Sequence, residues 1–294
     1  MNNLQLNAGR RLTQLASALL ANSYLAGFVN RTIYQGKVKQ LCVPFLNCYS
    51  CPGAVAACPV GSLQSLLASP TPRLSFYVLG LITLAGAAAG RLVCGWLCPF
   101  GLIQELLAKL GLKKYSLPRP LTWLKYPTLI LTVTLPVVWI GQNGLGAPYF
   151  CQYLCPAGTL EAGLLLGLGR PELRALLGSL FTWKLTILVI FLVATVFLYR
   201  PFCQTACPLG ALYGLFNPVS LWRLEVAAGR CNYCCACRKS CPLDIPVYHR
   251  PNSPDCIRCL ACTKACPNGA LTFSAAGRAG AREATPALRG PEAF

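Results

Sequence analysis

Eight cysteines near the C-terminus follow one spacing twice, and this spacing suits iron–sulfur chemistry. The pattern C-x-x-C-x-x-C-x-x-x-C-P begins at Cys231 and again at Cys256. Three thiolates on one short loop can bind three irons of a [4Fe–4S] cube, while the cysteine before proline binds the neighbouring cube. The spacing therefore predicts one cluster on Cys231, Cys234, Cys237 and Cys266, and a second on Cys256, Cys259, Cys262 and Cys241. Cys235 is left over, and a pair of zinc sites or a disulfide framework are the rival interpretations.

The composition is that of a membrane protein with redox cofactors. Of 294 residues, 55% are hydrophobic and 12% are charged, with 19 cysteines, one histidine and a formal net charge of +18. Anionic clusters would offset part of this charge, and basic residues hold membrane loops on the cytoplasmic side. We therefore expect membrane lipid, and not nucleic acid, as a partner. The chain has no C-x-x-C-H motif, so covalent haem is not expected. No constellation for hydrolysis is present, so no catalytic residue is assigned.

Four apolar segments are long enough to cross a bilayer as helices. They cover residues 12–30, 74–93, 121–140 and 181–199, and a cleaved signal peptide is the alternative for the first. The distribution of Lys and Arg places both the N-terminus and the C-terminal module on the cytoplasmic side. The prediction is a multi-pass protein of the cytoplasmic (inner) membrane. It has an α-helical membrane domain (1–221) with about four transmembrane helices and re-entrant Cys-Pro segments, a small α+β module (222–274) and a disordered tail (275–294).

A shorter motif, Cys-Pro-x-Gly followed by an apolar helix, occurs four times in the membrane domain. Its cysteines are Cys58, Cys98, Cys155 and Cys207, and a second cysteine precedes the last three by four residues, at Cys94, Cys151 and Cys203. Proline can begin the following helix without losing a hydrogen bond. The helix N-terminus then favours an anionic group. The repeat predicts metal ligation, and a structural cysteine pair is the alternative.

The predicted topology sorts these cysteines into an inner and an outer group. Cys94, Cys98, Cys203 and Cys207 meet on the inner face and are enough for one [4Fe–4S] cluster. The outer face receives six cysteines: Cys42, Cys48, Cys51, Cys58, Cys151 and Cys155. An outer cluster is expected on Cys151 and Cys155 with two of Cys48, Cys51 and Cys58. The alternative is that Cys48 and Cys51 form a redox-active dithiol.

The sequence CGWLCPFG at 94–101, the repeated C-x-x-x-C-P motifs and the C-terminal cysteine module together resemble the membrane polyferredoxin family, with its NapH-like and NosR-like members. The resemblance covers roughly residues 74–275. It implies a bacterial two-cluster ferredoxin domain at the C-terminus, and a role for Cys94, Cys98, Cys203, Cys207 and the eight module cysteines as cluster ligands. The segment from Cys42 to Cys58 and the pair Cys151/Cys155 go beyond the two motifs expected for NapH-like members.

The predicted function is electron transfer across the membrane through two ferredoxin-domain clusters, one inner cluster and one outer cluster. The expected partners are a soluble ferredoxin-like protein in the cytoplasm and a quinone/quinol or another redox subunit at the membrane or outer face. Two alternatives belong to other classes. One is a transmembrane thiol/disulfide reductase that uses Cys48 and Cys51, and the other is a cluster-bearing assembly or regulatory factor without net electron flux.

Overall fold

Helices make up most of the computed structural model, which describes residues 3–67, 75–110, 115–134, 147–167, 169, 172–173 and 177–275. The first part contains α1 (Asn3–Ala21), α2 (Leu25–Asn30), the 3₁₀ turn η1 (Lys37–Gln40), α3 (Pro59–Leu67), α4 (Phe76–Ala89), α5 (Leu92–Trp96) and α6 (Pro99–Leu107). The second part contains α7 (Arg119–Thr122), α8 (Lys125–Leu129), α10 (Pro156–Gly158), α11 (Leu165–Gly167), α13 (Ser179–Phe197), α14 (Pro201–Thr205) and α15 (Pro208–Phe216). Three π-helical turns, η2 (Ile130–Thr134), η3 (Phe150–Leu154) and η4 (Thr159–Leu164), lie among the latter.

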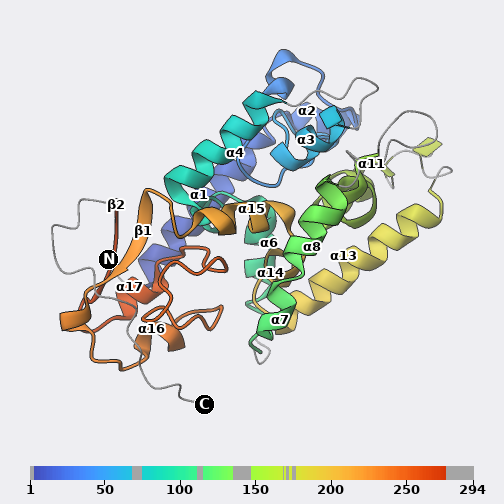
Figure 1. The fold of residues 1–294 in the computed structure, drawn as a ribbon. Coiled ribbons are helices and arrows are strands. Elements are labelled where there is room, and N and C mark those ends of the chain that lie inside the picture. The colour runs from blue at the N-terminus through green and yellow to red at the C-terminus, as the bar shows by residue number, and fades with distance from the viewer. Residues whose placement is uncertain are drawn as a thin grey trace.

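The two helices that follow the inner Cys-Pro motifs lie in the middle of the helical part. Helix α6 contacts both α1 and α13, and α15 contacts both α4 and α8 (Figure 1). Gly86 of α4 lets α15 approach closely, because a Cβ at this position would lie 2.6 Å from the ring of Phe216. The helices α1, α4 and α13 therefore surround a centre in which the cysteine motifs are packed.

The prediction of four membrane-spanning helices is not confirmed. Within the described ranges, α13 alone is long and apolar enough to cross a membrane, and α4 is a shorter apolar helix of 14 residues. The first predicted span is broken between α1 and α2, because Asn22 donates its side chain to the Ala18 carbonyl and Tyr24 N–H bonds to Gly53. The third is divided into α7, α8 and η2, and its residues 135–140 lie outside the described part of the chain.

The C-terminal module is a small α+β unit. Strands β1 (Trp222–Val226) and β2 (Leu271–Ala275) pair antiparallel, with Trp222 opposite Ala275, and enclose the turn η5 (Ala228–Arg230) and the helices α16 (Ala236–Lys239) and α17 (Ala261–Ala265). Equivalent positions of the two cysteine repeats adopt positive φ angles: Tyr233 and Arg258, and Cys235 and Leu260. Each cysteine loop therefore makes the same tight turns. The tail predicted to be disordered, apart from Ala275, lies outside the described residues.

Candidate iron–sulfur centres

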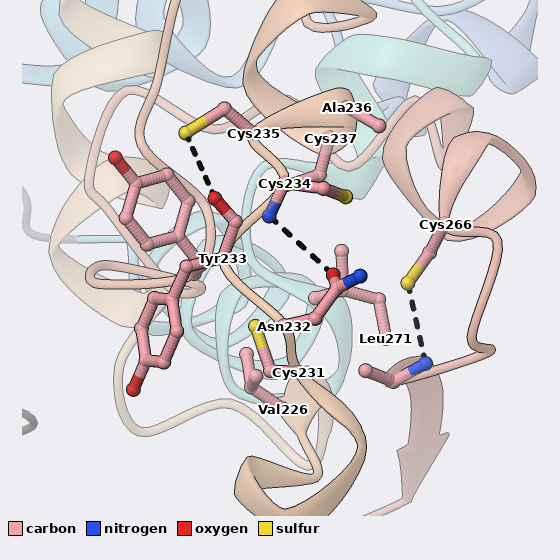
Figure 2. A pocket seen from close by; sticks show the side chains of 12 residues that line it. Val226, Cys231, Asn232, Tyr233, Cys234, Cys235, Ala236, Cys237, Cys266 and Leu271 are labelled. Carbon is pink, nitrogen blue, oxygen red and sulfur yellow. Dashed lines mark hydrogen bonds between the residues drawn. The ribbon is translucent and has the colours of Figure 1, made fainter.

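The eight cysteines of the C-terminal module line two separate pockets. One pocket is lined by Cys231, Cys234, Cys237 and Cys266, and the other by Cys241, Cys256, Cys259 and Cys262. These are the two sets of four that the spacing predicts. Figure 2 shows Cys231 and Cys266 approaching the first pocket from different segments of the chain. Cys235 also borders this pocket, but its thiol donates to the Tyr233 carbonyl oxygen at 3.4 Å (Figure 2).

Each of the two pockets is lined by the four cysteines that a [4Fe–4S] cube requires. Zinc thiolates lie roughly 3.8 Å from one another because each Zn–S bond is about 2.3 Å. No three His, Cys, Asp or Glu side chains in the described part of the chain converge closely enough to hold one ion. Burial raises the pKa of the Cys256 thiol to about 12. A cationic iron centre would be needed to hold such a thiol as the thiolate at neutral pH.

The inner group joins two motifs that are separated by about a hundred residues. Cys94 lies in α5 and Cys203 in α14, while Cys98 and Cys207 immediately precede α6 and α15. All four are buried in one hydrophobic core, and the charge of Cys207 would be felt by the other three thiols. The Gly210 N–H donates to Cys207 Sγ at 3.3 Å, and Gln104 Nε2 donates to Cys203 Sγ at 3.1 Å. Such hydrogen bonds to sulfur tune the potential of a cluster.

Two buried arginines link the inner motifs reciprocally. Arg91 donates from Nη2 to the Cys203 carbonyl at 2.7 Å, and Arg200 donates from Nη1 to the Cys94 carbonyl at 2.7 Å. Each guanidinium also lies against the motif glycine of the other copy. A Cβ on Gly210 would lie 3.1 Å from Arg91, and one on Gly101 would lie 2.9 Å from Arg200. The glycine of Cys-Pro-x-Gly therefore leaves room for the arginine that crosses from the other motif.

Sequence reasoning missed these arginines, although a signal was present. Arg91 precedes Cys94 by three residues and Arg200 precedes Cys203 by three residues, whereas Pro148 occupies this position before Cys151. The inner copies are thus R-x-x-C-x-x-x-C-P-x-G, and the outer copy lacks the arginine. Each side chain is fully buried. A positive charge inside an apolar core needs an anionic neighbour, which here includes Glu105 at 2.7 Å from Arg200.

Arg258 supplies a separate indication that an anionic group belongs here. Its side chain is fully buried beside Cys256, and no Asp or Glu within the described ranges forms an ion pair with it. Burial lowers its pKa to about 10, so it remains a cation at neutral pH. A buried unpaired cation is costly. The negative charge of a thiolate-ligated [4Fe–4S] cluster on Cys241, Cys256, Cys259 and Cys262 would balance it.

The outer cysteines are also brought together, from one segment that precedes α4 in the chain and one that follows it. Cys42, Cys48, Cys58, Cys151 and Cys155 line a cavity of about 840 Å³, while Cys51 is buried and is not among the residues that line it. Lys184 of α13 lies at this cavity and donates to the Cys151 carbonyl oxygen at 3.1 Å. Glu161 is a second charged group here, and its Oε2 accepts the Cys48 N–H at 2.7 Å. Sequence reasoning had not singled out Glu161.

Comparison with protein families identifies the kind of cofactor. A 4Fe-4S binding domain model matches residues 70–118, 125–170 and 180–225, and each of these segments contains one C-x-x-x-C-P motif. A second 4Fe-4S binding domain model matches residues 252–272. No solved structure matches the chain. The cofactors are therefore [4Fe–4S] clusters.

The relatives of the chain include proteins from archaea and bacteria. An uncharacterised protein of Methanocaldococcus jannaschii is 32% identical over 195 residues, which cover 63% of this chain and 72% of that protein. The ferredoxin-type protein NapH of Haemophilus influenzae is 26% identical, over 79% of this chain and 73% of the relative. The methylamine utilization ferredoxin-type protein MauN of Methylorubrum extorquens is 27% identical, over 62% and 59% respectively. The chain belongs to the polyferredoxin family of ferredoxin-type [4Fe–4S] electron-transport proteins.

Proposed function

We propose that the chain is a membrane-embedded relay that carries electrons between a ferredoxin-like partner in the cytoplasm and a quinone or redox protein at the membrane or outer face. Each [4Fe–4S] cluster supplies a one-electron redox centre. The ligands that we propose are the two sets of four module cysteines, the inner set Cys94, Cys98, Cys203 and Cys207, and an outer set. The residues of the chain hold these centres in a fixed series and exclude water between them.

The contacts between the module and the inner group support the first part of this series. Arg91, next to the inner cysteines, donates from Nη1 to the Pro254 carbonyl at 2.9 Å, and Trp96 donates its indole N–H to the Arg258 carbonyl at 3.0 Å. A Cβ on Gly95 would overlap the carbonyl oxygen of Ile257. Ile257 follows Cys256 directly and Gly95 follows Cys94 directly. The backbone next to Cys256 therefore contacts the backbone next to Cys94. This contact supports a short electron path between the module and the inner group.

The observation that carries the proposal is the packed connection between the inner and outer groups. Lys184 near the start of α13 contacts the Cys151 carbonyl, whereas Arg200 just after its end contacts the Cys94 carbonyl. The two groups thus lie beside opposite ends of a helix about 28 Å long, which is close to the thickness of a hydrocarbon core of about 30 Å. Tyr213 of α15 is fully buried and links the segment after the inner Cys207 to the segment that carries the outer cysteines.

Aromatic side chains fill the same interval. The Tyr213 hydroxyl donates to the Pro44 carbonyl at 2.9 Å, which ties α15 to the segment that carries the outer cysteines. Phe150 precedes Cys151 and Phe202 precedes Cys203, and their rings stack with centroids 6.5 Å apart. Phe100 meets Phe202 edge to face at 5.3 Å. These packed rings fill the space between the inner and outer groups, so an electron that moves between them would pass through packed atoms and not across a void.

The outer surface of the helices supports a place in the membrane. Helix α13 exposes Trp183, Val189, Ile190 and Val193, and α4 exposes Phe76 and Leu84. Helix α1 adds Leu12, Leu15, Leu19 and Leu20. Exposed apolar surface of this extent is unfavourable in water and is expected where a protein meets another apolar phase. We therefore propose that α1, α4 and α13 face lipid, and that the module lies on the cytoplasmic side.

Vesicles that contain the intact, cluster-loaded protein and a trapped electron acceptor test the proposal. A reduced ferredoxin is added outside under anaerobic conditions, and reduction of the trapped acceptor is followed optically. We expect reduction only in vesicles that contain the protein with its module outward. A Cys203→Ser variant, which removes an inner ligand, should abolish it while leaving the module clusters reducible. If the wild-type protein accepts electrons from ferredoxin but never reduces the trapped acceptor, the relay proposal is wrong.

A further inference from the structure

Six cysteines lie in the segments that form the outer cavity, and five of them line it. One cluster needs four, so the structure must be used to select among them. We propose that an outer [4Fe–4S] cluster is bound by Cys48, Cys58, Cys151 and Cys155, and that Cys42 and Cys51 are not ligands. This inference rests on the proposed relay, because it supplies the outer end of that series. The selection follows from three features: which cysteines line the cavity, which sulfurs face the motif glycines, and what surrounds the two remaining thiols.

The four proposed ligands line one cavity. Cys48, Cys58, Cys151 and Cys155 all border it, whereas Cys51 does not. Four thiolates around one cavity are the donor set of a [4Fe–4S] cluster.

The motif glycines connect the two outer segments in a reciprocal way. A Cβ on Gly158 would lie 3.5 Å from Cys48 Sγ and 3.7 Å from Cys155 Sγ, while a Cβ on Gly61 would lie 3.7 Å from Cys151 Sγ. Each Cys-Pro-x-Gly turn therefore faces a sulfur of the other segment. The inner site repeats this reciprocity through Arg91 and Arg200. The outer site thus resembles the inner site, in that two Cys-Pro-x-Gly turns face each other. It differs in one respect, because the turn at Cys58 lacks the cysteine four residues earlier.

That missing cysteine explains why Cys48 is required. In the three complete motifs the partner cysteine precedes Cys-Pro by four residues, but position 54 is Ala54. Cys48 occupies the vacant ligand position from a turn six residues earlier. Its backbone N–H donates to the Glu161 carboxylate at 2.7 Å, which holds this turn against η4. The carboxylate lies on the segment that follows Cys155, so the contact fixes Cys48 relative to its partner motif.

The two excluded thiols have other surroundings. Cys51 is buried, but it is not among the residues that line the cavity. Cys42 borders the cavity, but its thiol donates to Ser62 Oγ at 3.3 Å. A dithiol made of Cys48 and Cys51 would require Cys48 to leave the set of four. The geometry therefore favours a cluster at this site over a disulfide-exchanging pair.

Serine variants of the intact chain, purified anaerobically, test the assignment. Iron and acid-labile sulfide are measured per chain, with EPR of the reduced protein. The wild type should hold about sixteen irons, from four cubes of four. Cys48→Ser and Cys58→Ser should each lose about four irons or convert one cube to a three-iron signal. Cys51→Ser and Cys42→Ser, the matched controls, should keep the wild-type iron and spectrum. The EPR signals of the module clusters report that each variant has folded.

The opposite pattern would overturn the assignment: loss of a cluster in Cys51→Ser with a full complement in Cys48→Ser. Zinc in place of iron at this site, or about twelve irons in the wild type, would overturn it as well. These results are distinguishable from failure of the relay. A wild-type protein with about sixteen irons and the expected serine pattern, yet without transfer to a trapped acceptor, would refute the proposed function and leave the ligand assignment in place.

Discussion

Replacing Arg258 by methionine should loosen the ferredoxin module from the helical domain. The guanidinium of Arg258 donates to the carbonyl oxygens of Ala89, Asn217 and Trp222 and to Ser220 Oγ. Ala89 ends α4, and Asn217 and Ser220 follow α15, so one side chain joins the module to two helices. Methionine is similar in length and apolar, and it leaves the four acceptors, two of them buried, without this donor.

The expected magnitude follows from these bonds. Trp222 belongs to the module, so three of these bonds cross to the helical domain. A hydrogen bond to a charged group contributes about 2 kcal/mol, so the three contribute about 6 kcal/mol. Burial of the methionine side chain stabilises the docked state by about 2–3 kcal/mol and so offsets part of this loss. The net loss of docking free energy is therefore about 3–4 kcal/mol, which corresponds to an increase of between about 100-fold and 1,000-fold in the equilibrium constant for opening.

Amide hydrogen exchange of the intact loaded protein measures this opening. The Leu221 N–H bonds to the Ala87 carbonyl at 2.7 Å, directly between the helical domain and β1, and it reports on docking. Its exchange should accelerate by the predicted factor in Arg258→Met. Arg238→Met is the matched control, because Arg238 forms an exposed ion pair with Asp244 in the same module and contributes little. Equal exchange of Leu221 in Arg258→Met and in the wild type would refute the docking role.

Two further predictions concern the centre of the helical domain. Glu105→Gln should lower the free energy of unfolding by about 3–5 kcal/mol, because it leaves the buried cations Arg10 and Arg200 without their shared carboxylate. Chemical unfolding in detergent measures this, and an unchanged midpoint would contradict it. Tyr213→Leu should slow reduction of the outer centre on the order of ten-fold by opening a void in the packed path, whereas Tyr213→Phe should not. Freeze-quench EPR measures the rates, and equal rates in both variants would exclude this path.

The grouping of the module cysteines could be predicted from sequence because most of each group is local. In each repeat the first three cysteines occur within seven residues, so the loop itself determines which sulfurs can face one cube. The structure accordingly places the predicted two sets of four in two pockets. The membrane spans were less predictable. Hydropathy over residues 12–30 does not reveal the break at Asn22, where the Tyr24 N–H bonds to Gly53 and the Asn22 side chain also donates to Asn47.

The sequence by itself therefore determined the family and the kind of cofactor, and it predicted which module cysteines line each of two pockets. Tertiary structure decided the features that join distant segments. The reciprocal contacts of Arg91 and Arg200 connect motifs about a hundred residues apart, and Tyr213 meets the outer segment near Pro44 only when α15 is packed in the core. The placement of Cys48 in the outer cavity, with Cys51 outside its lining, likewise depends on Glu161, which is 113 residues away. Spacing restricts only residues that are close in the chain, whereas these contacts depend on how the helices pack.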